Sequence, residues 1–412
     1  MTGTNRRFLI ANYAKRVFSF LGFRRTLVTM LLMVVLVGLG ENMAERFLPI
    51  YVVALGGSAL SVGFLNGTDN LLSALYSFPG GYLSDKLGYK RALLVFNVVA
   101  MLGYVIVILI PAWWAVILGA VFFLSWSAIS LPATMSLVAT VLPENKRTMG
   151  VSMHSLVRRI PMALGPIIGG ILITWQGEIV GVRWAFIIAL LFAIIALILQ
   201  QVFIEDRKTG GKAEGNPIKL FREISPALRK LLTADILVRF CEQIPYPFMA
   251  IWVIKNNGIS PVTFGLLTTI EMVTAMLVYI PVAYLADNGS KKPFIVITFA
   301  FFTLFPLILM LSHSFWMFVL AFIIRGLKEF GEPTRKALIM DLAKEGKKAA
   351  MFGLYYLLRD VVVAFAAFSA GFLWKISPQV NFLIAFGFGL IGTIFFALFG
   401  QDILFQNKEK LI

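Results

Sequence analysis

The stretch GLGENMAERF, residues 38–47, places three ionisable side chains inside a long apolar run. Glu41, Glu45 and Arg46 follow the apolar residues RTLVTMLLMVVLV and precede LPIYVVALGG, and the whole run is long enough to cross a bilayer. A charged side chain in the middle of a membrane costs about 2.5–3.5 kcal/mol on insertion scales. These residues are therefore expected to face a polar cavity, where they pair with one another or act on a solute.

Charged residues recur at similar depths in the other apolar segments. They are Asp69, Arg158, Arg159, Arg239, Glu242, Glu271, Arg325, Lys328, Glu329, Arg359 and Asp360. Acids and bases nearly balance, and a spacing of three residues lets Arg239 pair with Glu242 along one helix face. One interpretation is therefore that many of these groups are structural ion pairs, for example the adjacent Arg359 and Asp360.

The second interpretation is transport chemistry. A carboxylate in a poorly hydrated cavity binds a proton more readily than in water, and an approaching arginine expels it. The acids predicted to carry protons are Glu41 first, then Glu45 and Asp69, with Glu242 and Glu271 in the second half. A guanidinium group binds a carboxylate or a phosphate through a planar fork. The side chains predicted to bind substrate are Arg46, Arg158, Arg325, Arg239 and Arg359, with Tyr51 as an aromatic wall.

The composition is that of a membrane protein. Hydrophobic residues make up 59% of the chain and charged residues 14%, whereas soluble domains are about one quarter charged. Cys241 is the single cysteine, which excludes an internal disulfide and a cysteine-based metal site. With two histidines in the whole chain, no metal site is expected.

Apolar runs of about 20 residues mark membrane spans, because 20 helical residues cover the hydrocarbon core. The expected fold is an all-α membrane protein with twelve transmembrane helices in two six-helix bundles. The expected spans are 26–54, 59–84, 91–110, 113–141, 148–174, 183–204, 231–256, 262–286, 293–312, 315–342, 350–374 and 379–405.

The positions of Lys and Arg predict the orientation of the chain. Basic residues gather in the N-terminal segment and in every connection from an even to an odd span, whereas the opposite loops hold few. Both termini are therefore expected in the cytoplasm, in the inner membrane of a prokaryote. The net charge of +16 then reflects topology and does not indicate a nucleic-acid partner.

The longest polar interruption, residues 205–230, divides the spans into six and six. Its Gly, Lys and Pro content is typical of a linker. The expected organisation is a cytoplasmic N-terminal segment, a first bundle, a cytoplasmic linker, a second bundle and a cytoplasmic tail. Their ranges are 1–25, 26–204, 205–230, 231–405 and 406–412.

The two halves repeat each other. A shift of 201 residues places Glu242 on Glu41, and a shift of 202 places Glu271 on Asp69. A parallel repeat of six plus six spans is the architecture of transporters that bind their solute near the bilayer midplane, between the two halves.

The segment GGYLSDKLGYKR, residues 80–91, resembles the loop 2–3 signature of the major facilitator superfamily, G-x-x-x-D-[RK]-x-G-x-[RK]-[RK]. The positions that match are Gly81, Asp85, Lys86, Gly88, Lys90 and Arg91. The resemblance implies a latch that closes the cytoplasmic side, in which Asp85 pairs with a basic group or a helix N-terminus. A tight basic turn that only fixes topology is the alternative.

Two further segments resemble signatures of the same family. LPENKRTMG, residues 142–150, is similar to the loop 4–5 signature, and ALGPIIGG, residues 163–170, to the end of a span-5 antiporter motif. The matching residues of the second are Gly165, Pro166, Gly169 and Gly170. Small residues at this spacing also let helices pack closely, so packing alone is the alternative. Span 4 lacks the arginine that many proton antiporters carry there.

The expected function is secondary active transport by alternating access, driven by a proton gradient and without a cofactor. The expected solute is small, polar, and anionic or zwitterionic, and the alternative is multidrug or lipophile efflux by a proton antiporter. An enzyme is not expected, and the chain has no nucleotide-binding G-x-x-x-x-G-K-[ST] segment. The expected partners are the solute and the lipid bilayer, with the protein as a monomer.

Overall fold

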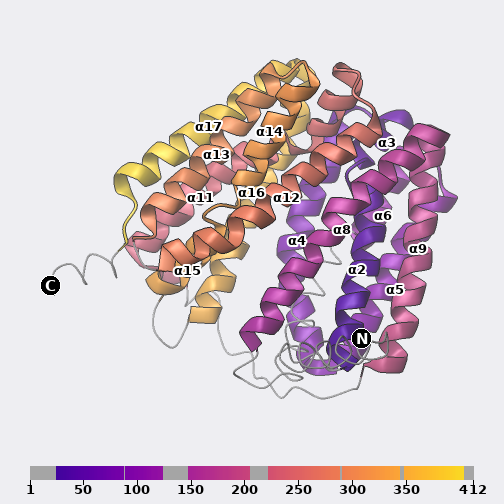
Figure 1. The fold of residues 1–412 in the computed structure, drawn as a ribbon, viewed down its shortest axis with the longest axis horizontal. Helices are drawn as coiled ribbons and strands as arrows, with labels where there is room; N and C mark the ends of the chain where they lie inside the picture. The colour runs from indigo at the N-terminus through magenta and orange to yellow at the C-terminus, as the bar shows by residue number, and fades with distance from the viewer. Residues whose placement is uncertain are drawn as a thin grey trace, which may run out of the picture.

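A computed structural model describes residues 25–87, 89–123, 147–204, 221–287, 290–343 and 348–402. Throughout these ranges the regular structure is helical and contains no strand, which confirms the predicted fold class. The helices form two bundles that lie side by side (Figure 1). Eight of the described helices are long and apolar enough to cross a membrane.

The N-terminal bundle contains the first six spans. Its helices are α2 (Arg25–Glu45), α3 (Leu48–Ala54), α4 (Ala59–Leu87), α5 (Tyr89–Leu109), α6 (Trp113–Phe123), α8 (Arg147–Gln176) and α9 (Glu178–Phe203). The predicted start of the sixth span was wrong, because α9 begins at Glu178, directly after Gly177. Gly177 has a positive φ of 79°, which allows a sharp turn between α8 and α9.

The C-terminal bundle contains the other six spans. Its helices are α11 (Pro226–Gln243), η2 (Tyr246–Phe248), the π-helix η3 (Ile251–Asn256), α12 (Pro261–Asp287), α13 (Lys292–Leu311), α14 (Phe315–Leu327), α15 (Glu332–Leu342), α16 (Lys348–Ile376) and α17 (Pro378–Phe399). Of the predicted linker, residues 205–220 lie outside the described residues, as do residues 1–24 and the tail 406–412.

Three spans that the sequence predicts as continuous are broken. The first span stops at Glu45 and restarts as α3 with Pro49 in its first turn. The seventh stops at Gln243, passes through the Pro247-containing η2 and continues as η3. The tenth is divided into α14 and α15. Proline cannot donate a backbone hydrogen bond within a helix, and this explains the first two breaks.

The bundles contact each other through α4 with α16 and through α8 with α12. A Cβ atom on Gly63 of α4 would lie 2.7 Å from the Gly371 nitrogen of α16. A Cβ atom on Gly265 of α12 would lie 2.5 Å from the Pro166 carbonyl oxygen of α8. These glycines lie near the start of α4 and α12 and allow the backbones to touch there. We call this end of the molecule the closed end.

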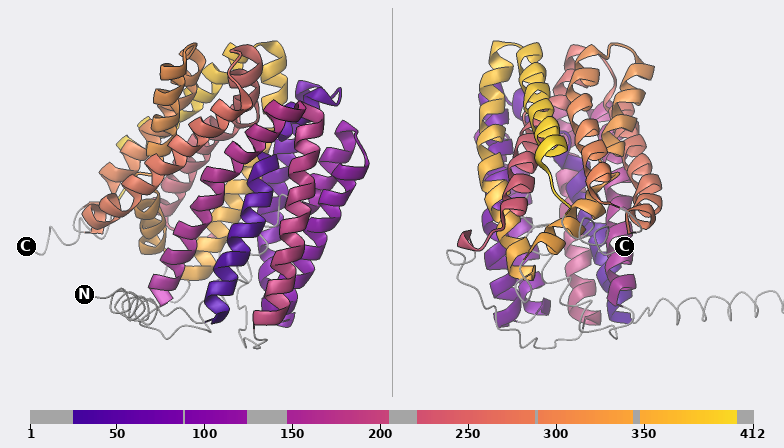
Figure 2. Two further views of the ribbon diagram at one scale, coloured as in Figure 1. Left: turned by 45° about the vertical axis from the view of Figure 1, so that its right-hand side comes forward. Right: turned by 90° about the vertical axis from the view of Figure 1, so that its left-hand side faces the viewer.

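The bundles diverge away from the closed end. Figures 1 and 2 show the helices meeting at the top of the molecule and separating towards the bottom, where α2 begins. Within the N-terminal bundle, α2 packs against α8 and α9. Gly165 supports this packing, since a Cβ atom there would lie 2.7 Å from the Asn42 Cβ.

Candidate functional site

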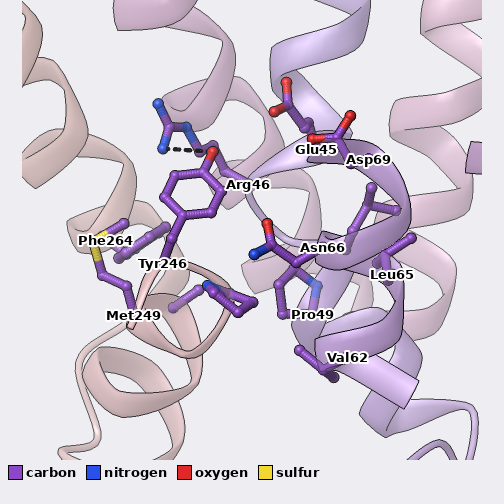
Figure 3. Close-up of a pocket in the computed structure, with 13 residues that line it drawn as sticks. Glu45, Arg46, Pro49, Val62, Leu65, Asn66, Asp69, Tyr246, Met249 and Phe264 are labelled. Carbon is purple, nitrogen blue, oxygen red and sulfur yellow. Dashed lines mark hydrogen bonds between the residues drawn. The ribbon is translucent and has the colours of Figure 1, made fainter. Parts of the chain in front are cut away.

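A pocket lies where the broken first and seventh spans face each other (Figure 3). Its empty space is about 490 Å³, including space open to solvent. Both bundles contribute to the lining. The residues are Glu45, Arg46, Leu48, Pro49, Val62, Leu65, Asn66, Asp69, Tyr246, Pro247, Met249, Ala250 and Phe264. The wall is thus largely apolar and carries three charged residue types, from α2, the turn that follows it and α4.

Glu45 and Asp69 form the acidic part of the pocket. Figure 3 shows their carboxylates next to each other, and Asp69 is close enough to feel the charge of Glu45. The Ser73 hydroxyl donates a hydrogen bond of 3.4 Å to Asp69. Among the described residues, neither carboxylate accepts a hydrogen bond from a basic side chain. Such a pair favours sharing a proton over carrying two negative charges.

Arg46 is the cationic group of the pocket. Its Nη1 donates a hydrogen bond of 3.2 Å to the Tyr246 hydroxyl, across the interface between the bundles. Its buried Nε has no hydrogen-bond partner. The guanidinium therefore has donors left for an acceptor that enters the pocket. The Tyr246 ring also lies 5.5 Å from the Arg325 guanidinium, so one tyrosine contacts two arginines.

Arg325 and Glu271 neutralise each other behind the pocket. Arg325 of α14 donates a 2.8 Å hydrogen bond to Glu271 of α12, and the two side chains are 3% and 1% exposed. Arg325 also contacts the Met249 sulfur at 3.2 Å. Sequence reasoning assigned one of this pair to substrate and the other to protons, but the structure joins them in a buried ion pair.

Polar contacts across the bundle interface surround the pocket. Asn70 of α4 donates to the side chain of Gln243 at 3.3 Å, and Asn66 donates to its carbonyl oxygen at 3.4 Å. Arg159 of α8 forms an ion pair of 3.1 Å with Glu329, which follows α14. These contacts join the two bundles at the level of the pocket.

A second charged cluster lies in the C-terminal bundle outside the pocket lining, and Asp235 of α11 is its centre. This carboxylate is fully buried and accepts hydrogen bonds from Arg335 and, at 2.9 Å, from Tyr355. The Arg359 guanidinium lies 3.5 Å from the same carboxylate. Sequence reasoning missed Asp235, although it lies inside the predicted span 231–256 and carries a charge there.

The same cluster contains Glu242, which was predicted to carry protons. It forms ion pairs of 2.5 Å with Arg239 and with Lys328. Glu332 is held by Arg335 through two hydrogen bonds, of 2.6 and 2.8 Å. The structure therefore places Arg239, and with it Arg359, in ion pairs and outside the pocket lining.

Three other predicted site residues also lie outside the pocket lining. Glu41 is 8% exposed within the N-terminal bundle, one helical turn before Glu45. Tyr51 is fully buried in the hydrophobic core, and its hydroxyl has no hydrogen-bond partner. Arg158 is half-buried on α8 and close enough to Glu45 to feel its charge.

The predicted latch is described in part. Gly81, Asp85 and Lys86 belong to α4, but their side chains lie outside the described part, and Gly88 lies outside it altogether. Arg91 is exposed, and Lys90 donates a 2.8 Å hydrogen bond to the Gln201 carbonyl oxygen at the end of α9.

The second half has an equivalent clamp. There the Lys291 amide donates 2.6 Å to Asp402, beyond the end of α17. A shift of 201 residues relates both partners, Lys90 with Lys291 and Gln201 with Asp402. In each half, the start of the third helix is thus tied to the end of the sixth.

The antiporter-like segment lies at helix contacts. Gly165 and Gly169 face α2, and Gly170 faces α12, where a Cβ atom would lie 2.5 Å from the Pro261 carbonyl oxygen. The carbonyl of Pro166 approaches Gly265. All four residues therefore permit close approach of backbones, two of them across the bundle interface.

Comparisons with known proteins agree with this architecture. The family model described as Major Facilitator Superfamily matches residues 30–241 and 231–410. The uncharacterized MFS-type transporter MJ1317 of Methanocaldococcus jannaschii is 24% identical over 362 residues, which cover 84% of this chain and 87% of that protein. The multidrug resistance protein MdtG of Salmonella arizonae is 28% identical over 67% of this chain and 70% of its own length.

Solved structures share the fold. A crystal structure of the nucleoside transporter NupG superimposes with a TM-score of 0.77 at 13% identity, covering 91% of this chain and all of that one. A POT family transporter in complex with 5-aminolevulinic acid also gives a TM-score of 0.77, at 14% identity, over 92% of this chain and 96% of that one.

Proposed function

The chain belongs to the Major Facilitator Superfamily, and from this membership and the pocket we propose that it is a proton-coupled secondary transporter of a small zwitterionic or anionic solute. The observation that carries the proposal is the juxtaposition of Glu45, Asp69 and Arg46 in one pocket between the bundles. Membership supports secondary transport through the membrane, and the charges of the pocket support the coupling and the class of solute.

Proton coupling follows from the two carboxylates. Two acids that lie close together in a largely apolar pocket repel each other when both are ionised, so one of them holds a proton. A third charge alters this balance. A solute that brings an ammonium group stabilises both carboxylates as anions and releases the proton, whereas an empty pocket takes the proton up again. Glu45 and Asp69 are thus the coupling groups in this proposal.

The solute class follows from Arg46. Its guanidinium bonds one tyrosine hydroxyl and retains a buried Nε–H without a partner, which suits a carboxylate or phosphate. The opposite side of the pocket offers the two acids to a cationic group. Leu65, Phe264 and the other apolar lining residues then contact the body of the solute. A zwitterion with an apolar body fits all three parts.

Alternating access follows from the arrangement of the bundles. In this proposal both termini lie in the cytoplasm and the protein lies in the inner membrane, so that the closed end faces outward and the bundles separate towards the cytoplasm, as in an inward-facing state. The proposed energy source is the proton gradient, with no cofactor, and the proposed unit is the monomer.

Reconstitution tests this function. The protein is placed in liposomes with an imposed pH gradient, and uphill movement of zwitterionic, anionic and cationic solutes is measured, with protein-free liposomes as the control. We expect accumulation of a zwitterion or anion that collapses when a protonophore is added. Accumulation that persists under the protonophore would contradict proton coupling.

A second candidate is efflux of amphipathic cations. Two acids and a largely apolar wall also suit a lipophilic cation, and the relative MdtG is named as a multidrug resistance protein. The same assay separates the candidates. Uphill transport of a cationic dye, without transport of a zwitterion or an anion, would favour efflux of amphipathic cations. In that case, Arg46 serves to position the acids.

A further inference from the structure

A groove on the outer surface of the bundles runs beside the contact between α4 and α16, at the closed end. Its empty space is about 880 Å³, including open space. Three helices line it, and none of the lining residues is charged. They are Leu60, Ser61, Phe64, Trp113, Trp114, Ile117, Phe368 and Phe372.

The lining belongs to both bundles. Phe64 of α4 and Phe368 of α16 contact each other across the bundle interface, with ring centroids 5.5 Å apart. The next residues inward are the glycines of the contact, Gly63 and Gly67, so the groove continues the interface outward. Anything that fills the groove therefore touches both bundles at once.

The groove opens sideways and lies near the membrane surface. Phe64, Trp114 and Phe372 are 52%, 51% and 63% exposed, which is a large apolar exposure for three neighbouring rings. Trp113 and Trp114 begin α6, and tryptophan is enriched where a span meets the lipid headgroups. A groove at this level of the bilayer would face the upper part of the lipid acyl chains.

We propose that this groove is a binding site for the acyl chain of a phospholipid in the leaflet at the closed end. The chain is held between α4, α6 and α16, and it binds the closed arrangement of α4 and α16 better than a separated one. A ligand with such a preference shifts the conformational equilibrium towards the state that it prefers. The lipid thus stabilises the closed end from the side, independently of the solute pocket.

The pseudo-repeat supplies a matched control. A shift of 202 residues places Trp316, the second residue of α14, on Trp114, the second residue of α6. Trp316 is 76% exposed, and it is not among the residues that line the groove. The same shift places Leu266 on Phe64, so the second half has no aromatic ring at that position.

Quenching by labelled lipid tests the proposal. Single-tryptophan proteins that keep Trp114 or Trp316, with the other tryptophans replaced by Phe, are reconstituted in phosphatidylcholine vesicles. The vesicles contain a low fraction of phosphatidylcholine with a nitroxide high on one acyl chain. We expect Trp114 fluorescence to be quenched at least about twofold more than Trp316 fluorescence, because bound lipid is retained next to Trp114.

Two changes locate the effect. Ser61→Phe fills the groove and should reduce quenching of Trp114 to the level of Trp316, whereas Leu320→Phe on the exposed face of α14 should change neither. Gly67→Leu forces α4 away from Phe368 and should also reduce quenching of Trp114. Equal quenching of Trp114 and Trp316 in the proteins without these further substitutions overturns the proposal. Weaker quenching of Trp114 also overturns it and indicates that another protein copy covers the groove.

Discussion

The two halves of the molecule use their charges differently, although their sequences repeat. In the first half, Glu45 and Asp69 face the pocket, and among the described residues no basic side chain is bonded to them. Their counterparts in the second half are Tyr246 and Glu271, and Glu271 is paired with Arg325. The comparison suggests that the first half supplies the groups that change charge and that the second half supplies a fixed frame.

The frame consists of ion pairs that are costly to break. Asp235 lies among Arg335, Arg359 and Tyr355 with no exposure to solvent. Its position in the repeat corresponds to Val34 of α2, an apolar core residue. A buried pair contributes little net stability compared with an apolar pair, but removal of one partner leaves the other charge uncompensated.

The largest expected effect is on this frame. Asp235→Asn leaves Arg335 and Arg359 without their shared carboxylate, and we expect a loss of about 3–5 kcal/mol in the free energy of unfolding. Thermal unfolding in detergent, followed by intrinsic fluorescence, measures it. Asp360→Asn is the control, because its side chain is 32% exposed and such a pair contributes about 0–1 kcal/mol. Similar losses in the two variants would contradict the assignment of Asp235 as the centre.

The next effect concerns coupling in the first half. Glu45→Gln keeps the shape of the side chain but removes the proposed proton site, so uphill transport in proteoliposomes should be lost while downhill exchange persists. Glu41→Gln is the matched comparison, one turn earlier on the same helix and outside the pocket lining. If Glu41→Gln abolishes uphill transport and Glu45→Gln does not, the coupling group is Glu41, as the sequence alone predicts.

A smaller effect is expected from Arg46→Lys. Lysine keeps the charge but loses the planar fork, so affinity for an anionic or zwitterionic solute should fall roughly tenfold, about 1.4 kcal/mol. A binding titration of the identified solute measures this. Arg325→Lys should instead lower the unfolding temperature, since that arginine holds Glu271. Normal solute binding by the Arg46→Lys variant would contradict the assignment of Arg46 to the binding site.

The smallest effect is expected from Tyr246→Phe. The ring stays between the two arginines, but Arg46 loses the hydroxyl that fixes its guanidinium. A single hydrogen bond of this kind contributes about 1 kcal/mol, so affinity should fall roughly fivefold. The same titration applies, with Tyr104→Phe as a control in the core of the N-terminal bundle. A larger loss of affinity than in the Arg46→Lys variant would show that Tyr246 contributes more to solute binding than Arg46 does.

Much of the fold could be predicted from the sequence because span length and loop charge are direct consequences of the bilayer. The helix breaks were harder to predict. Pro49, Pro245 and Pro247 are visible in the sequence, but an apolar run does not reveal whether a proline bends a span or interrupts it. The break after Glu45 is the feature that brings Glu45 and Arg46 to the pocket.

For the candidate site, the sequence predicts only how deep each charged residue lies along its membrane span. Sequence position places Glu41 and Glu45 at similar levels and on one helix face, yet Glu45 ends α2 and lines the pocket while Glu41 packs inside the bundle. Likewise, the pairing of Arg325 with Glu271 joins residues that are 54 apart in the chain. Spacing arguments detect only partners three or four residues away, such as Glu329 for Arg325, and in the structure Glu329 pairs with Arg159.

The glycine contacts at the closed end provide a point about which a long helix can rotate. Gly63 and Gly67 lie in the first turns of α4, and about 20 residues of that helix, or about 30 Å, extend beyond them. A rotation of about 10° around these glycines therefore carries the far end of α4 through about 5 Å, while the backbones at the fulcrum hardly move. The hydrogen bonds of Lys90 and Lys291 lie at the opposite end of the bundles from these glycines. There they hold the third and sixth helices of each half together, so that each bundle rotates as a unit.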